Sequence, residues 1–201
     1  MLLWLASLAS CGHVHDKTSQ PPAGWVSQQA ANSALDSWYI QGRLGVQTEK
    51  QGGSLDVFWN QQGERYQLRL IAPMGQGAFF IEGDAQQVSL TNADGSIHSS
   101  DNPDALFSQS LGVSLPLASL HDWLRGLPAR EDKRLQWNEL GQLYIVEQNG
   151  WRVEITRYRD QAGYQLPHAF YLSRADQPDL MVRLLLRSWQ LQDLPALEAA
   201  P

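Results

Sequence analysis

The sequence has a single cysteine, Cys11, among its 201 residues, so no disulfide bond can form within the chain. It also has no apolar run near the roughly 20 residues that a membrane-spanning helix needs. A late run of three leucines, Leu184-Leu185-Leu186, lies between Arg183 and Arg187. The fold therefore depends on no covalent cross-link, and the sequence predicts no membrane-spanning helix.

Positive charge is scarce as well. The chain carries 15 Lys and Arg residues against 21 Asp and Glu residues, a net charge of -6. A surface that binds nucleic acid needs a basic patch, and the composition offers no excess of basic residues to build one. We therefore expect no nucleic-acid partner.

Recognisable catalytic motifs are missing too: the sequence contains no Gly-x-Ser-x-Gly elbow, no His-Glu-x-x-His helix and no Walker loop. His13 and His15 could bind a metal weakly, but a solvated linker is the simpler interpretation. His121 lies beside Asp122 on a predicted helix and is better explained as a surface residue than as a base. The stretch Asn92-Ala93-Asp94-Gly95 lacks the acidic ligands that follow in a calcium loop. Nothing in the sequence supports an enzyme, a cofactor or a metal site, so we expect none, although an enzyme stays open on the residues alone.

Cys11 itself stands in an informative place. It follows an apolar run over residues 1–8 and the small residues Ala9 and Ser10, and it precedes a polar tract over residues 12–24. That order is typical of a signal-peptide core, a cleavage region and a flexible tether. A cysteine at the cleavage point resembles a bacterial lipobox, in which the thiol is lipidated. The alternative, a small buried cysteine, is less favoured because a polar tract offers no core to enter.

The length suits one domain with a sizeable core. We expect residues 1–10 to be a signal-peptide remnant and residues 11–24 to be the lipidated cysteine and its tether. Residues 25–190 then form a single domain, and residues 191–201 form a frayed C-terminal tail.

Hydrophobic periodicity predicts the elements of that domain. Residues 25–37 have a helical period, and residues 39–71 alternate as a three-stranded antiparallel meander. A strand over 78–82 and a hairpin of 87–90 with 96–98 follow. Two helices start at Pro103 and near Leu115, and they end at Gly112 and Gly126. The remaining predicted strands cover residues 135–140, 142–148, 151–158, 168–174 and 180–189.

The fold class is therefore mainly β (α+β), with many consecutive antiparallel strands interrupted once by a helical pair. A strongly twisted sheet of this size curls, and with helices to insert it can enclose an apolar cavity. Eight tryptophans supply large side chains for a core or for a ligand cavity. For most of the inward apolar positions plain core is an equally good interpretation. The cavity candidates are Leu44, Val46, Val57, Trp59, Leu68, Leu70, Phe80, Trp123, Tyr144, Val146 and Val153.

The stretch over residues 72–77 is a loop by its proline and glycines, with Met74 at the tip between Pro73 and Gly75. Met74 either folds back onto the core or stands in solvent, and the sequence supports both interpretations about equally. An exposed, flexible apolar side chain would suit contact with a lipid-like partner.

Several segments in a fixed order resemble the LolB family of outer-membrane lipoprotein receptors. The resemblance runs from about Trp25 to Trp189, with the lipobox ahead of it. The segments that carry it are Trp38 with Gly42-Arg43, Val57-Phe58-Trp59, Tyr66-Gln67-Leu68-Arg69-Leu70, Ala72-Pro73-Met74-Gly75, Leu115-Pro116-Leu117, Trp123-Leu124-Arg125-Gly126-Leu127-Pro128, Gln148-Asn149-Gly150-Trp151, Leu166-Pro167 and Trp189.

The resemblance implies an unclosed antiparallel β-barrel covered by helices, with an apolar cavity for acyl chains. It implies a non-enzymatic monomer that accepts lipoproteins from the periplasmic carrier LolA, without ATP, and inserts them into the inner leaflet of the outer membrane. Its partners would then be LolA, acylated lipoproteins and the bilayer. The protein would be held at the periplasmic face of a Gram-negative outer membrane through Cys11. Gly12 is not the aspartate that retains lipoproteins at the inner membrane in some bacteria.

In that family an apolar residue of the protruding loop, commonly leucine, hands the lipid to the membrane. The resemblance assigns this role to Met74.

Two other functions stay open on the residues alone. One is an envelope lipoprotein that binds a different apolar ligand or partner. The other is a lipid hydrolase, against which the missing nucleophile elbow counts.

Overall fold

The computed structural model describes residues 19–50, 52–75, 77–84, 86–111, 115–130 and 133–197. Cys11, with the predicted signal remnant and most of the predicted tether, lies outside these ranges. Within them the helices are α1 (Trp25–Ser33), α2 (Pro103–Leu111) and α3 (Leu117–Leu124), and a short 3-10 turn, η1, covers Pro73–Gly75. The strands are β1 (Ser37–Gln47), β2 (Gly52–Gln62), β3 (Arg65–Ile71), β4 (Ala78–Gly83), β5 (Val88–Thr91), β6 (Ile97–Ser100), β7 (Lys133–Trp137), β8 (Leu143–Gln148), β9 (Trp151–Gln161), β10 (Tyr164–Arg174) and β11 (Gln177–Gln190).

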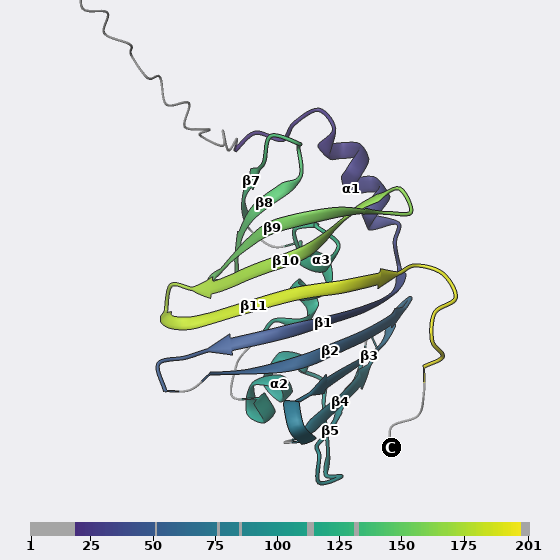
Figure 1. Ribbon diagram of the computed structural model, residues 1–201, viewed down its shortest axis with the longest axis vertical. Helices are drawn as coiled ribbons and strands as arrows, with labels where there is room; N and C mark the ends of the chain where they lie inside the picture. Colours follow the sequence, from purple (N-terminus) through teal and green to yellow (C-terminus); the bar gives the residue numbers. More distant parts are fainter. Residues whose placement is uncertain are drawn as a thin grey trace, which may run out of the picture.

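All of these strands belong to one antiparallel sheet in the order β6-β5-β4-β3-β2-β1-β11-β10-β9-β8-β7. β6 and β7 are its two edges, so in the described part of the chain the sheet does not close on itself. Figure 1 shows the sheet curling, with α2 and α3 behind its strands and α1 beside the β9–β10 turn. The predicted fold class, an unclosed antiparallel barrel with helices, is confirmed.

Alternation of apolar and polar residues explains which face of the sheet is buried. On β1 the buried side chains include Trp38, Ile40 and Leu44, which are two or four residues apart and so share a face. Ile40 pairs with Trp59 of β2 on one side and with Trp189 of β11 on the other. Large apolar side chains from the middle of the sheet and from both ends of the chain therefore meet in one core.

Two turns have the residues that their backbone geometry requires. Asn149 and Gly150 have φ values of 52° and 75°, the left-handed pair that a tight hairpin between β8 and β9 needs. Gly126 has φ 72° just after α3, where an L side chain would be strained and glycine is not.

Some predicted boundaries are wrong. The first helix ends at Ser33, not Ser37, because Ser37 joins β1 and pairs with Gln62. β10 begins at Tyr164, four residues before the predicted start at His168. A proline usually marks the end of a central strand, but here the register shifts at Pro167, and this irregularity lets the strand pass through it.

The described part of the C-terminal tail is also not frayed. Leu191 packs against the core. The carbonyl of Pro195 accepts hydrogen bonds from the side-chain amides of Asn60 and Gln62, each 2.8 Å long. The segment after β11 thus lies against β2, which corrects the expectation of a frayed tail for residues 191–197.

Candidate functional site

The loop between β3 and β4 carries the most exposed large apolar side chain among the described residues. Met74 is 95% exposed. Its backbone has φ 56° and ψ 28°, a left-handed conformation that is uncommon for a residue other than glycine or asparagine. This conformation, between Pro73 and Gly75, turns the side chain into solvent. Of the two interpretations of Met74, the structure therefore supports exposure.

The β3–β4 ladder fixes the base of that loop. Ile71 pairs with Ala78, and the amide of Ala72 donates to the carbonyl of Gly77 at 2.9 Å. The loop therefore closes directly at the end of the sheet, and Met74 projects from a paired base.

Several hairpins lie at this same end, which we call the loop end of the sheet. Antiparallel pairing places the β1–β2 connection there, because Gln47 pairs with Gly52. It also places the β10–β11 and β8–β9 turns there, through the pairs of Arg174 with Gln177 and of Gln148 with Trp151.

The concave face of the sheet is apolar and is covered by α3. Between them lies a cavity of about 20 Å³. A single water needs about 10–15 Å³ on this measure, so the helix nearly fills the concave face. The cavity is lined by Ile40, Leu44, Val57, Trp59, Leu68, Leu70, Leu115, Leu117, Leu120, Leu124 and Leu184.

Both ends of α3 are fastened by polar contacts. At its start the amide of Leu117 donates to the Asp104 carboxylate of α2 at 2.9 Å. Just after its end Arg125, which is nearly buried, donates to the carbonyl of Leu35 at 3.1 Å and to Asp122 at 2.6 Å. Asn32 of α1 donates to the Arg125 carbonyl at 2.7 Å. These bonds hold α3 against the sheet and the α1–β1 connection.

The charge on Asp122 is matched to this role. Partial burial raises the pKa of its carboxyl, but the hydrogen bond from His121 and the charge of Arg125 lower it by more, so the net shift is downward. Asp122 is therefore ionised at neutral pH and pairs with Arg125. His121 is not a bare surface residue, because its ring stacks on Trp38 with 5.8 Å between ring centroids.

Five of the predicted cavity residues line the cavity: Leu44, Val57, Trp59, Leu68 and Leu70. Val46 is half-buried at the edge of the core. Trp123, Val146 and Val153 are fully buried in the core and do not line this cavity. The indole of Trp123 donates to Gln148 at 3.1 Å and so links α3 to β8.

Two of the predicted positions do not point inward. Phe80 pairs with the exposed Arg69 and lies next along the strand to Ile81, which is buried, so Phe80 is on the outer face. Tyr144 is half-buried outside the core cluster, and its hydroxyl donates to the carboxylate of Glu154. The prediction that these two residues face the cavity is wrong.

The residues that sequence reasoning left out are mostly the leucines of α3 and of the segment before it. Leu117, Leu120 and Leu124 form an apolar stripe that is visible in the sequence, but of that helix the prediction includes only Trp123. Leu184 on β11 pairs with the predicted residue Leu44, and Ile40 on β1 shares a face with it.

Proteins of known structure share this architecture. The fold is similar to that of a solved LolA superfamily protein from Nitrosomonas europaea. That protein has a TM-score of 0.54 at 13% identity, over 85% of this chain and 94% of that chain. A DUF1329 family protein from Desulfovibrio piger aligns with a TM-score of 0.57 at 6% identity, over 86% and 94% of the two chains. By architecture the protein thus falls in the class of LolA-like folds.

The sequence comparisons are more specific. The family model "Outer membrane lipoprotein LolB" matches residues 36–189. The outer-membrane lipoprotein LolB of Pseudomonas fluorescens is 35% identical over 196 residues, covering 95% of this chain and 94% of the relative. That of Pseudomonas aeruginosa is 35% identical over 195 residues, covering 94% of each. The chain therefore belongs to the LolB family of outer-membrane lipoproteins. None of the helices in the described ranges has the length and apolar character needed to cross a bilayer.

Proposed function

We propose that this protein accepts lipoproteins from the periplasmic carrier LolA and inserts them into the inner leaflet of the outer membrane, acting as a monomer anchored through a lipidated Cys11. The observation that carries the proposal is the nearly complete exposure of Met74 at the end of a sheet whose concave face is apolar. The first feature suits contact with a bilayer, and the second suits an acyl chain. Membership of the LolB family supports both assignments.

The acyl chains of the cargo would lie between the concave face and α3. The cavity of about 20 Å³ is too small for them, so α3 has to move away from the sheet when cargo enters. Each methylene taken out of water contributes about 0.8 kcal/mol to binding, so an acyl chain with many methylenes gains many times that amount. An apolar lining of leucine and tryptophan side chains can supply that stabilisation without any specific polar contact.

Transfer then requires no bond to be made or broken. Cargo moves from one apolar site to another and finally into the bilayer, and small differences in affinity set the direction. In this scheme the protein is a binding protein without ATP or another cofactor, and it has no catalytic residue.

The first test follows labelled cargo. The protein is mixed with a complex of LolA and an acylated lipoprotein, without ATP, and is then recovered by pull-down. Cargo that moves onto the protein supports the acceptor role. Cargo that stays on LolA, with the protein shown to be folded by circular dichroism, contradicts it and favours a LolB-like fold that binds another apolar ligand.

The second test separates acceptance from insertion. Met74→Glu should still accept cargo, because Met74 lies outside the cavity lining. It should release cargo into vesicles at least about tenfold more slowly, because burying a side chain of this kind stabilises by about 1.5–3 kcal/mol and a carboxylate cannot be buried in the same way.

Leu140→Glu is the matched control. Leu140 is also a well-exposed apolar residue in a turn, but the turn between β7 and β8 lies at the opposite end of the sheet. We expect this variant to insert cargo normally and Met74→Leu to do the same. Insertion by Met74→Glu at the rate of the unmodified protein would remove the loop from the mechanism.

A further inference from the structure

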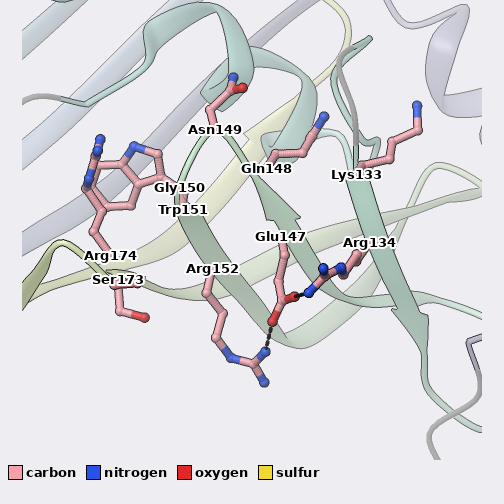
Figure 2. Close-up of a pocket in the computed structure, with 11 residues that line it drawn as sticks. Lys133, Arg134, Glu147, Gln148, Asn149, Gly150, Trp151, Arg152, Ser173 and Arg174 are labelled. Carbon is pink, nitrogen blue, oxygen red and sulfur yellow. Dashed lines mark hydrogen bonds and ion pairs between the residues drawn. The ribbon is translucent and has the colours of Figure 1, made fainter.

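A pocket whose charged wall residues are mostly basic lies where β7, β8, β9 and β10 end together, and it has a volume of about 710 Å³. Among the described residues, its lining includes the cations Lys133, Arg134, Arg152 and Arg174 and one carboxylate, that of Glu147. This concentration of positive charge is unusual in a chain with a net charge of -6. Figure 2 shows Glu147 between Arg134 and Arg152, with Arg174 beside Trp151 on the other side of the pocket.

The pocket is at the loop end of the sheet. Lys133 pairs with Gln148, and Arg174 pairs with Trp151, so these residues lie in the first or last pairs of their ladders beside the β8–β9 turn. The Met74 loop closes the β3–β4 ladder at the same end. One end of the curled sheet therefore presents both an exposed apolar side chain and a group of cations.

The arginines of the pocket pair with acidic side chains at the surface. Glu147 lies 3.9 Å from Arg134, whose side chain is 90% exposed, and it also pairs with Arg152. Arg174 forms two hydrogen bonds of 2.8 Å with the exposed carboxylate of Asp176. Exposed ion pairs contribute little to stability, so an incoming anion can replace Glu147 beside Arg134 at small cost, whereas the bidentate pair of Arg174 and Asp176 is the stronger one.

The remaining walls suit a phosphate group. The guanidinium of Arg174 lies over the Trp151 ring, 5.3 Å from its centroid, and this contact keeps it in place. Guanidinium groups bind phosphate oxygens in pairs, which makes arginine the side chain best matched to such a ligand. Asn149 and Ser173 add neutral polar side chains to the lining.

We propose that this pocket binds the phosphate of an anionic phospholipid headgroup and orients the loop end of the sheet toward the membrane. A bilayer offers an apolar layer for Met74 and anionic phosphates for the cations on one and the same surface. A soluble acidic protein would meet the cations but would leave Met74 in water. This inference rests on the proposed function, because it assumes that Met74 enters the bilayer.

The test measures binding to vesicles with the full chain carrying Cys11→Ala, so that no acyl group anchors it. Sedimentation is compared for vesicles of pure phosphatidylcholine and for vesicles with one quarter phosphatidylglycerol. Each cation near an anionic surface adds about 1 kcal/mol, a factor of about five in affinity. Arg134→Gln combined with Arg152→Gln should therefore weaken binding to the anionic vesicles about 30-fold.

Two further variants make the result specific to this pocket. Arg157→Gln combined with Arg159→Gln removes the same charge from exposed positions on β9, further from the loop end. It should leave binding within about twofold of the unmodified protein. Glu147→Gln removes the carboxylate from the pocket and should strengthen binding to anionic vesicles about fivefold. A folding defect cannot produce such a gain.

Equal loss in the two double variants would overturn the proposal, because net charge and not this pocket would then govern binding. Normal vesicle binding by the Arg134 and Arg152 double variant would overturn it as well. If that variant instead accepts cargo from LolA poorly, the pocket serves an acidic protein surface. Failure of the proposed function is a separate result, namely cargo that stays on LolA in the absence of vesicles.

Discussion

His168 shows how one buried residue links the sheet to pH. The residue is 3% exposed, its Nδ1 lies 3.1 Å from the carbonyl of Leu186, and its Nε2 has no hydrogen-bond partner among the described residues. Burial lowers the pKa of His168, and the charges of Arg159 and Arg157 act in the same direction, although the bond to Leu186 opposes them. The folded state therefore favours the neutral ring.

The sign of the pH effect follows from this lowered pKa. The unfolded chain binds a proton near pH 6.5, but the folded chain does so only at lower pH. The stabilisation that neutral His168 gives to the folded state is complete above pH 6.5. It is lost as the pH falls from there through the folded-state pKa of His168. The carboxylates with lowered pKa values, such as Asp122 and Asp176, titrate below this window.

His168→Gln should therefore flatten the pH dependence of stability between pH 6.5 and 5. The measurement is the urea midpoint at several pH values for the unmodified protein, for His168→Gln and for His98→Gln at an exposed position. We expect the midpoint of the unmodified protein and of His98→Gln to fall more steeply than that of His168→Gln. Parallel curves for all three proteins would show that His168 does not contribute.

At the scale of single residues, the face on which a side chain lies could be predicted only where apolar and polar residues alternate strictly. Leu68 and Leu70 alternate with Gln67 and Arg69, so their common face could be predicted. Phe80 stands in the run Phe79-Phe80-Ile81, where every residue is apolar and hydrophobicity does not define a parity. Tyr144 stands in a similar run between Leu143 and Ile145. Only pairing with known neighbours places such residues on a face.

At the scale of elements, β1 depends on close contact with β11 at one glycine. The register between these strands shifts at Gln41 and Gly42, where a bulge interrupts the ladder. A Cβ atom on Gly42 would lie 2.6 Å from the carbonyl oxygen of Leu185 and 2.9 Å from the Leu186 side chain. Glycine is therefore needed here because the backbones approach each other too closely for a side chain.

Gly42→Ala should lower the free energy of unfolding by about 1–3 kcal/mol, the usual cost of overpacking. Gly45→Ala on the same strand is the control, since its Cβ would have only the Arg183 carbonyl oxygen nearby, at 3.8 Å. It should change stability by less than about 0.5 kcal/mol. Chemical denaturation measures both values. Equal effects from the two substitutions would mean that the bulge can relax around a methyl group.

The helices were only partly predictable at this scale. The leucine stripe of α3 and its terminating glycine indicated a helix and its buried face. They did not show that Arg125 would be nearly buried. Arg125 bonds to Asp122 of the neighbouring helix α3, but it also bonds to Leu35, which lies 90 residues earlier in the chain. Such a pairing has no local signal in the sequence.

At the scale of the whole molecule, pairing between strands that are far apart in the sequence completes the sheet. β1 and β11 come from opposite ends of the described chain, yet they lie side by side in the middle of the sheet. Alternation predicted a meander over residues 39–71 but not this pairing. Trp38, Trp59 and Trp189 then meet with centroid distances of 5.5 and 5.3 Å from Trp38. The concave face thus exists only when the complete sheet has formed.

Some buried leucines line the cavity on the concave face, and others lie elsewhere in the core. Leu120 lines the small cavity between the sheet and α3, whereas Leu143 is fully buried elsewhere in the core. Truncation of either leucine to alanine should lower the free energy of unfolding by about 2–5 kcal/mol. Only Leu120→Ala enlarges the space in which we propose that acyl chains lie.

Leu120→Ala should therefore bind a fluorescent fatty acid more tightly than the unmodified protein, because less of the binding free energy is used to displace α3. Leu143→Ala should bind it no more tightly despite a similar loss of stability. Urea unfolding and a fluorescence titration provide the two measurements on the same samples. Tighter binding by both variants would indicate that general loosening of the core admits the chain. Weaker binding by Leu120→Ala would place the acyl site away from α3.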